Sequence, residues 1–198
     1  MPLFIPTYFS PISQYSEIYK QSKIVFEVED NYQKQSYRNR CYIFNTNGKQ
    51  LLNIPVKHPK KELRKKTKDA LVENATPWQD QHLKSLKTAY RNSPFFEFYI
   101  DDLMPIFEKK YTYLQEVNID TFLFINDALQ LEVPFTKTNS FIENFGDNDY
   151  RNFASAKNHP EVSPKKYIQM FDDKHGFIPN LSILDLLFME GPNAISFL

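Results

Sequence analysis

A ten-residue stretch, residues 32–41, gathers side chains that bind anions and reads Tyr-Gln-Lys-Gln-Ser-Tyr-Arg-Asn-Arg-Cys. In an extended chain, side chains alternate between two faces. One face would then carry four donors: Lys34, Ser36, Arg38 and Arg40. Because a guanidinium group binds phosphate or carboxylate through two hydrogen bonds, this face predicts an anion site. The alternative interpretation is a strand whose outer face is only solvated.

His82 is the residue best placed to carry a proton. It follows Trp78 by four residues, so both lie on one face of a predicted helix. An imidazole that lines a cleft can act as acid or base near neutral pH. We therefore predict His82 as the candidate catalytic residue, with a hydrogen-bonded position in the core as the alternative.

Other common chemistries lack their sequence signatures. The four glycines stand singly, so neither a P-loop nor a dinucleotide-binding fingerprint is present, and no G-x-S-x-G motif occurs. The four histidines show no H-x-x-x-H or H-E-x-x-H spacing, and only one cysteine accompanies them. From these patterns we expect no metal site and no cofactor.

Length and charge indicate one folded domain with no excess of either sign. A chain of 198 residues buries roughly 70% of its unfolded surface on folding, so residues 1–198 are predicted to form a single domain. Basic and acidic residues number 24 each, but residues 57–68 hold seven basic residues and one acidic, a net charge of +6. We interpret this run as a solvated loop. Nucleic-acid binding, which uses a basic face on a basic domain, is disfavoured.

Three features indicate a cytoplasmic protein without a membrane span. The single cysteine, Cys41, cannot form an internal disulfide, which favours the cytosol. The first residues, Met-Pro-Leu-Phe-Ile-Pro, lack the basic start of a signal peptide. No apolar run approaches the about 20 residues that cross a bilayer. The sequence gives no sign of the oligomeric state.

Apolar periodicity predicts an α/β fold that opens strand-helix-strand. Residues 3–7 form the first strand, residues 10–20 a helix with Pro11 in its first turn, and residues 23–28 a buried second strand. In open sheets of this kind, ligands bind beyond the carboxyl ends of the strands. The cationic stretch follows the second strand directly, so it is expected next to that edge.

A β-hairpin and a mainly helical second half follow. Residues 40–45 and 50–56 are predicted to pair around Asn47-Gly48, a turn sequence that supplies positive φ. The remaining predicted elements are a helix over 76–92, helices capped by Asp101-Asp102 and by Asp120, a strand over 133–136, an irregular loop over 144–164, a strand over 167–171 and a docked C-terminal helix beginning near Ser182.

Motifs along nearly the whole chain match those of one known family. They are Tyr8-Phe9-x-Pro11 with Tyr15, the stretch 32–40, Ile54-Pro55-Val56, Trp78 with His82 and Tyr90, residues 93–96, and residues 179–188 with Gly191-Pro192. The chain thereby resembles the WbqC-like family, in the version typical of Bacteroidetes. Members occur in O-antigen gene clusters, so the resemblance implies a part in building or decorating surface polysaccharide.

The chain departs from the family pattern in two places. Many members begin with His-Gln-Pro, where this chain has Phe4-Ile5-Pro6-Thr7. A glycine-rich segment found late in many members is replaced by Asp149-Tyr150-Arg151. No catalytic role carries over from either feature.

Two hypotheses on function come from the residues and the resemblance together. The first is an enzyme, a transferase of surface-glycan synthesis, that acts on a phosphate-bearing or carboxylate small molecule such as a nucleotide sugar. The second is a non-catalytic binding or scaffold protein that recognises an acidic partner. The site predicted for the first hypothesis comprises His82 as proton carrier, Lys34, Arg38 and Arg40 as phosphate-binding residues, and Tyr8, Tyr37 and Asn39 as further substrate-binding residues.

Overall fold

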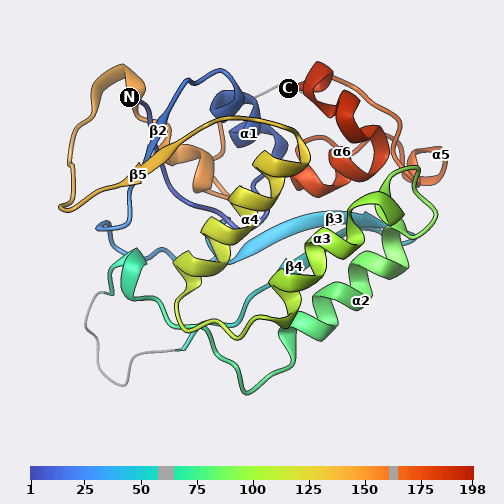
Figure 1. The fold of residues 1–198 in the computed structure, drawn as a ribbon, viewed down its shortest axis with the longest axis horizontal. Helices are drawn as coiled ribbons and strands as arrows, with labels where there is room; N and C mark the ends of the chain where they lie inside the picture. The colour runs from blue at the N-terminus through green and yellow to red at the C-terminus, as the bar shows by residue number, and fades with distance from the viewer. Residues whose placement is uncertain (58–64, 161–164) are drawn as a thin grey trace.

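A three-stranded parallel sheet brings two strands from the start of the chain together with one from its second half. The computed structural model describes residues 1–57, 65–160 and 165–198. Strand β2 (Ile24–Phe26) lies between β1 (Leu3–Phe4) and β5 (Phe135–Lys137), with Val25 opposite both Leu3 and Thr136. The three strands run in the same direction, so their carboxyl ends meet at one edge of the sheet (Figure 1).

The predicted strand-helix-strand opening is confirmed. Helix α1 (Ile12–Tyr19) connects β1 to β2 and begins directly after Pro11. Its buried face carries Ile12, Tyr15 and Ile18, which recur at helical spacing. Connections between parallel strands of one sheet need a crossover of this kind.

The predicted hairpin is also confirmed. Strands β3 (Arg40–Asn45) and β4 (Gly48–Asn53) pair antiparallel, with Asn45 opposite Gly48 at the turn. Gly48 has φ of +99°, a conformation that glycine adopts at little cost. The Asn-Gly signal therefore identified the turn correctly.

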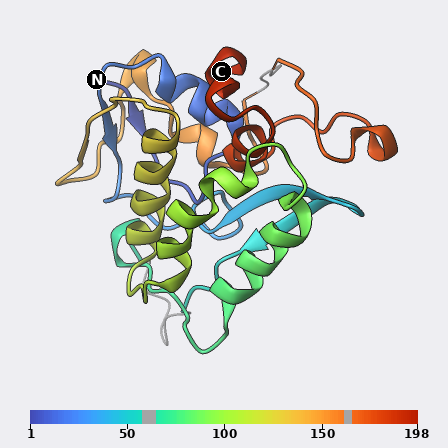
Figure 2. The same cartoon turned by 45° about the vertical axis from the view of Figure 1, so that its right-hand side comes forward.

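Three helices cover the sheet and the hairpin. Helix α2 (Trp78–Tyr90) packs on β3, α3 (Phe96–Glu108) lies beside α2, and α4 (Leu114–Ala128) lies beside α3 (Figures 1 and 2). From α4, the ring of Phe122 packs edge-on against Phe26 and Phe135, at centroid distances of 5.1 and 5.5 Å. These contacts join the sheet to the helices in one hydrophobic core.

Two helix starts differ from the prediction. Asp101 and Asp102 lie inside α3, not at its cap, and Pro105 lies near its end. Asp120 lies inside α4, which begins at Leu114, where the Glu116 carboxylate accepts hydrogen bonds from the backbone N–H groups of Thr112 and Tyr113. A side chain that caps from inside the first turn gives no signal before the helix, which explains the error.

The remaining elements are short. They are the 3₁₀ turns η1 (Thr67–Asp69), η2 (Gly146–Asn148), η3 (Arg151–Ala154) and η4 (Gly191–Phe197), the single turn α5 (Asp172–His175) and helix α6 (Ile183–Glu190). The docked C-terminal helix is confirmed, and Ser182 caps it by accepting from Leu184 N–H at 3.2 Å. The strand predicted over 167–171 is wrong: the side-chain amide of Gln169 pairs with the backbone of Ile178 and replaces a strand ladder.

No helix within the described residues is long and apolar enough to cross a membrane. The predicted irregular loop over 144–164 contains η2 and η3, and its residues 161–164 lie outside the described residues. Most of the basic run 57–68 also lies outside them, because the structure describes only its two ends.

Candidate functional site

A cleft of about 330 Å³ opens at the carboxyl edge of the parallel sheet. Its walls come from the segments that follow β1, β2 and β5 and from η3. The lining residues are Ile5, Asp30, Asn31, Gln33, Arg38, Phe141, Arg151, Asn152 and Ser155. The cleft thus lies where ligands of open α/β sheets bind, as the strand-helix-strand opening led us to expect.

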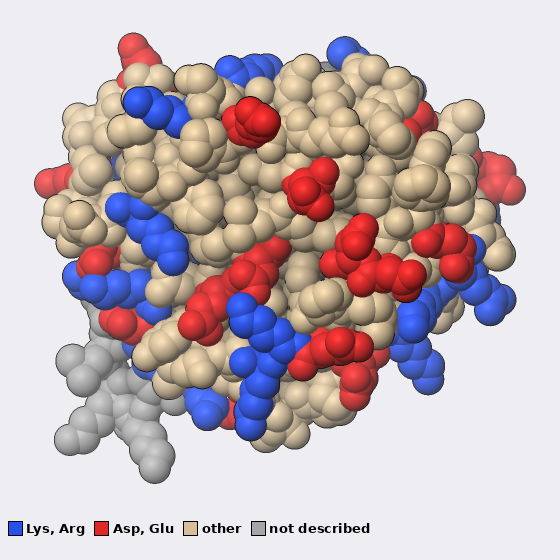
Figure 3. Space-filling model, viewed as in Figure 1, with Lys and Arg blue, Asp and Glu red and all other residues tan. Residues whose placement is uncertain are grey.

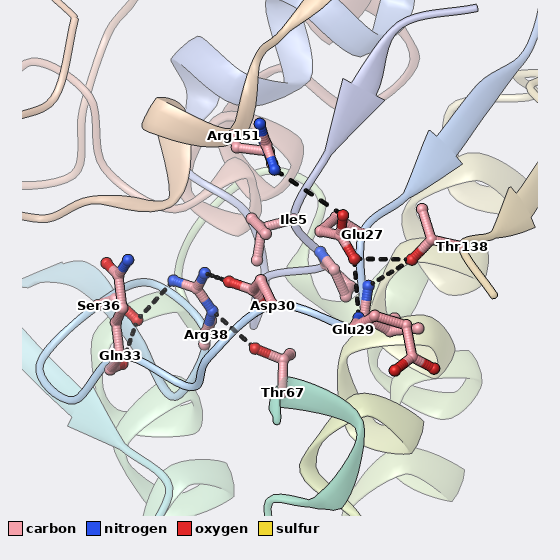
Figure 4. Close-up of polar contacts among 12 residues, drawn as sticks. Ile5, Glu27, Glu29, Asp30, Gln33, Ser36, Arg38, Thr67, Thr138 and Arg151 are labelled. Atoms are coloured by element: carbon pink, nitrogen blue, oxygen red, sulfur yellow. Dashed lines mark hydrogen bonds and ion pairs between the residues drawn. The ribbon is translucent and has the colours of Figure 1, made fainter. Parts of the chain in front are cut away.

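Arg38 is the predicted site residue that lies in this cleft. Its side chain is only 3% exposed, and three of its five N–H groups have protein partners (Figure 4). Nε donates to Thr67 Oγ1 at 3.3 Å, Nη1 to Ser36 Oγ at 3.3 Å, and Nη2 to Asp30 Oδ2 at 2.5 Å. Two N–H groups of a fixed guanidinium therefore have no partner among the described residues.

The segment that carries Arg38 is a series of turns, so the prediction of an extended row of donors is wrong. Gln35 has φ of +57°, Ser36 Oγ donates to the carbonyl of Gln33, and Asn39 N–H donates to the carbonyl of Ser36. The turns are fixed by distant backbone: Tyr37 N–H donates to Ala154 at 2.9 Å, and Tyr37 accepts from Tyr8 N–H at 2.9 Å.

Lys34, Asn39 and Arg40 consequently lie apart from the cleft. Lys34 is exposed, and Arg40 is half-buried on β3, where its Nε donates to Asn53 Oδ1 at 3.3 Å. The buried amide of Asn39 donates to Asn53 Oδ1 and to the carbonyl of Ile54. None of the three lines the cleft.

Tyr8 and His82 form a separate contact inside the core. The Tyr8 hydroxyl lies 2.9 Å from His82 Nδ1, and both side chains are at least 95% buried. Burial lowers the pKa of His82 to about 4, and a hydrogen bond to the backbone of Asn53 opposes this shift. The imidazole is therefore neutral at pH 7 and packs against the Trp78 ring, as in the core alternative.

The carboxylates after β2 are held by a dense set of bonds. Glu27 is fully buried and accepts from Glu29 N–H, Thr138 Oγ1 and Ile142 N–H (Figure 4). The carboxylate of Glu29 binds Lys66 and Lys68, two described residues from the end of the basic run. The hydrogen bond from Lys66 is the largest of the effects that lower the pKa of Glu29.

Arg151, the second arginine of the cleft, was missed from the sequence. Its guanidinium binds the Asp149 carboxylate, donates to the carbonyls of Ile142 and Glu143, and lies 3.8 Å from Glu27 Oε2. The Arg151 hydrogen bond lowers the pKa of Asp149. With its N–H groups so used, Arg151 holds the segment after β5 against β2. The only feature of the sequence that could have pointed to Arg151 is the Asp-x-Arg spacing, which places it two residues after Asp149.

A second polar cluster, also missed, ties α1 to the end of the 144–160 segment. His159 Nε2 lies within hydrogen-bond distance of Ser13 Oγ, at 2.6 Å, and of the side-chain amide nitrogen of Asn180, at 3.1 Å, and Ser13 N–H donates to Asn180 Oδ1. Ser13 is only 1% exposed. Each of these polar atoms has a partner within the chain. The cluster therefore holds α1, the end of the 144–160 segment and the loop of Asn180 together.

The described residues contain no group of three His, Cys, Asp or Glu side chains arranged to hold a metal ion. Polar side chains line a cleft at the end of a short parallel sheet, which defines an α/β protein with a polar cleft at its sheet edge. The chain belongs to the WbqC-like protein family, whose model matches residues 6–159. That range includes Asp30, Arg38 and Arg151. No curated protein and no solved structure is significantly similar to the chain.

Proposed function

We propose that the cleft binds an activated, anionic small molecule such as a nucleotide sugar. The observation that carries the proposal is the buried Arg38 guanidinium, which lines the cleft with two N–H groups unpaired among the described residues. A guanidinium in this state favours a phosphate oxygen. The exposed amides of Asn31, Gln33 and Asn152 supply further donors around it.

The family context supports a role in surface-polysaccharide synthesis. Members of the WbqC-like family occur in O-antigen gene clusters, where nucleotide sugars are the activated building blocks. We therefore propose a transferase that uses such a donor. In this proposal Arg38 contacts the substrate, while Tyr37 and Asn39 hold the turns that fix its guanidinium.

The alternative, a scaffold for an acidic macromolecule, fits the geometry less well. Arg38 is 3% exposed, so only a molecule small enough to enter the cleft can reach its guanidinium. The face formed by α3 and α4 carries acidic side chains with some basic ones among them (Figure 3), and the charged residues that line the groove there are Asp101, Asp102, Asp120 and Asp127 together with Lys109, which pairs with Asp120. An acidic partner would be repelled from that face.

Thermal unfolding with ligand tests the proposal. UDP-glucose, UDP-N-acetylglucosamine and dTDP-glucose are each added to the wild type, and at least one is expected to raise Tm by several degrees at about 100 times its Kd. Arg38→Lys keeps the charge but loses the planar fork, so this shift should largely disappear. Arg40→Lys is the matched change outside the cleft and should retain the shift.

Two results would contradict the proposal. One is a wild type whose Tm no nucleotide sugar raises. The other is a shift that is lost in Arg40→Lys and kept in Arg38→Lys, which would move the site to the surface of the hairpin.

A further inference from the structure

Asp30 differs from the other two carboxylates at the end of β2. Each oxygen of Glu27 and of Glu29 has a hydrogen-bond donor or a cation beside it. Asp30 uses only one oxygen, because Oδ2 accepts from Arg38 and Oδ1 has no hydrogen-bond partner among the described residues. Asp30 is also the one of the three that lines the cleft. A buried carboxylate oxygen without a donor is costly, so a hydrogen-bond donor placed against Oδ1 would stabilise Asp30.

Asp30 is unable to satisfy that oxygen by turning elsewhere. Its backbone carbonyl accepts from Thr67 N–H at 2.8 Å, and its side chain is fixed through Oδ2 by Arg38. Arg38 is itself fixed by Thr67 and Ser36. The carboxylate is thus held through Oδ2 and the backbone through its carbonyl, while Oδ1 is buried and has no hydrogen-bond partner among the described residues.

The chemistry of the donor follows from its neighbours. A phosphate oxygen is repelled by a carboxylate, so it binds Arg38 and not Asp30 Oδ1. The group that fits Oδ1 is a hydroxyl, which donates one hydrogen bond without adding charge. Phe141, 53% exposed, also lines the cleft, and an aromatic ring can cover the C–H face of a pyranose. Phosphate acceptors and sugar hydroxyls occur together in a nucleotide sugar.

We propose that Asp30 Oδ1 accepts a hydrogen bond from a hydroxyl of the glycosyl group, so that the cleft selects the sugar part of its ligand. This inference rests on the proposed function and adds the specificity-determining residue. A site built to bond a substrate hydroxyl rejects the analogue that lacks it, because its own polar group is then left unpaired.

Calorimetric titration of the wild-type chain of 198 residues provides the test. The tightest-binding of UDP-glucose, UDP-N-acetylglucosamine and dTDP-glucose is compared with its free nucleoside diphosphate and with its mono-deoxy sugar analogues. One deoxy analogue should bind about 10- to 100-fold more weakly than the parent, as expected for a lost hydrogen bond to a charged acceptor. A buried water in place of the sugar hydroxyl would leave every deoxy analogue as tight as the parent, which overturns the inference.

Asp30→Asn should weaken the binding of the nucleotide sugar without weakening that of the nucleoside diphosphate. Affinity for the nucleotide sugar should fall about tenfold or more, while affinity for the nucleoside diphosphate should hold or rise, because Arg38 loses its paired carboxylate. Asp127→Asn, the same change on the exposed surface of α4, is the control and should alter neither. Parallel losses for both ligands in Asp30→Asn would mean a structural role and overturn the inference.

The outcomes separate the inference from the proposed function. If Asp30→Asn does not fold, the deoxy series on the wild type still decides. A wild type that binds nucleotide sugars and nucleoside diphosphates equally overturns only the selection of the sugar by Asp30. A wild type that binds none of them overturns both proposals.

Discussion

Asp30 Oδ2 lies 2.5 Å from Nη2 of Arg38, and both side chains are at least nine-tenths buried. This pair joins the end of β2 to the turns that precede β3. Removing one partner of a buried ion pair leaves the other charge without compensation, which typically costs about 3–5 kcal/mol. Arg38→Ala is therefore expected to lower the free energy of unfolding by that amount, measured by urea denaturation.

The double variant Asp30→Ala with Arg38→Ala tests whether the loss comes from the pair. Once both charges are gone, neither is left buried alone, so its loss should be smaller than the sum of the single losses by about 2 kcal/mol. Arg40→Ala, which breaks a single half-exposed bond to Asn53, should cost less than about 1 kcal/mol. If the loss of stability in the double variant equals the sum of the losses in the two single variants, the two side chains act independently.

The sequence was enough to predict the hairpin and the strand-helix-strand unit, because residues close together in the chain determine both. The hairpin was predictable because Asn47-Gly48 supplies the positive φ that the turn needs. The opening unit was predictable because Ile12, Tyr15 and Ile18 repeat at helical spacing between two short apolar runs. The strand-helix-strand unit also predicted the edge of the sheet at which the cleft opens.

The details of the site were not predictable, because distant segments determine them. Residue type alone made Arg38 a candidate anion ligand, but its segment turns because the backbone of Tyr37 bonds to Ala154 and Tyr8. Arg151 reaches the cleft from η3, and no spacing in the sequence connects it with Asp30. The aromatic stripe that holds His82 was compatible with a position in a cleft or in the core. Only the three-dimensional structure shows that His82 is buried in the core.

The pH dependence of stability should reveal the buried His82. Its folded pKa of about 4 lies below the unfolded value of about 6.5. Between these two pH values the unfolded chain binds a proton that the folded chain does not, so stability falls as the pH is lowered from 6.5 to 4. The full shift corresponds to about 3 kcal/mol.

His82→Asn removes this titration while keeping a polar group near Tyr8. The variant should be less stable than the wild type at pH 7, and the difference should shrink or reverse as the pH approaches 4. Subtracting the two curves cancels other titrating groups, including Asp185. Urea unfolding at half-unit pH steps measures the effect, and curves that stay parallel would show that His82 titrates normally.

Tyr90 links β3 to α6 through a fully buried carboxylate. Its hydroxyl donates to Asp185 Oδ1 at 2.6 Å and accepts from Phe44 N–H at 3.0 Å, while Tyr167 donates to Asp185 Oδ2. Burial raises the pKa of Asp185 to about 6, so the carboxylate is mostly ionised at pH 7. Tyr90→Phe leaves an N–H and a carboxylate oxygen without that partner, and should cost about 3 kcal/mol at pH 7.

Tyr19→Phe is the matched control for that change. Tyr19 is 39% exposed at the end of α1, so loss of its hydroxyl should alter stability by less than about 0.5 kcal/mol. Equal effects of the two substitutions in urea unfolding would mean that the Asp185 network adds nothing beyond packing.

Gly191 ends α6 in a conformation and a space that only glycine fits. Its φ is +54° with ψ of −129°, and a Cβ there would lie 2.5 Å from Cδ1 of the Phe95 ring. Gly191→Ala must therefore strain the backbone and displace a ring that packs on the core, at a cost of about 3 kcal/mol or more.

Gly146→Ala is the control, because its φ is +66° but nothing lies within 4 Å of the added Cβ. It should cost only about 1 kcal/mol. At about 2–4 °C per kcal/mol for a chain of this size, differential scanning calorimetry resolves the two variants, and equal melting temperatures would show that Phe95 yields without cost.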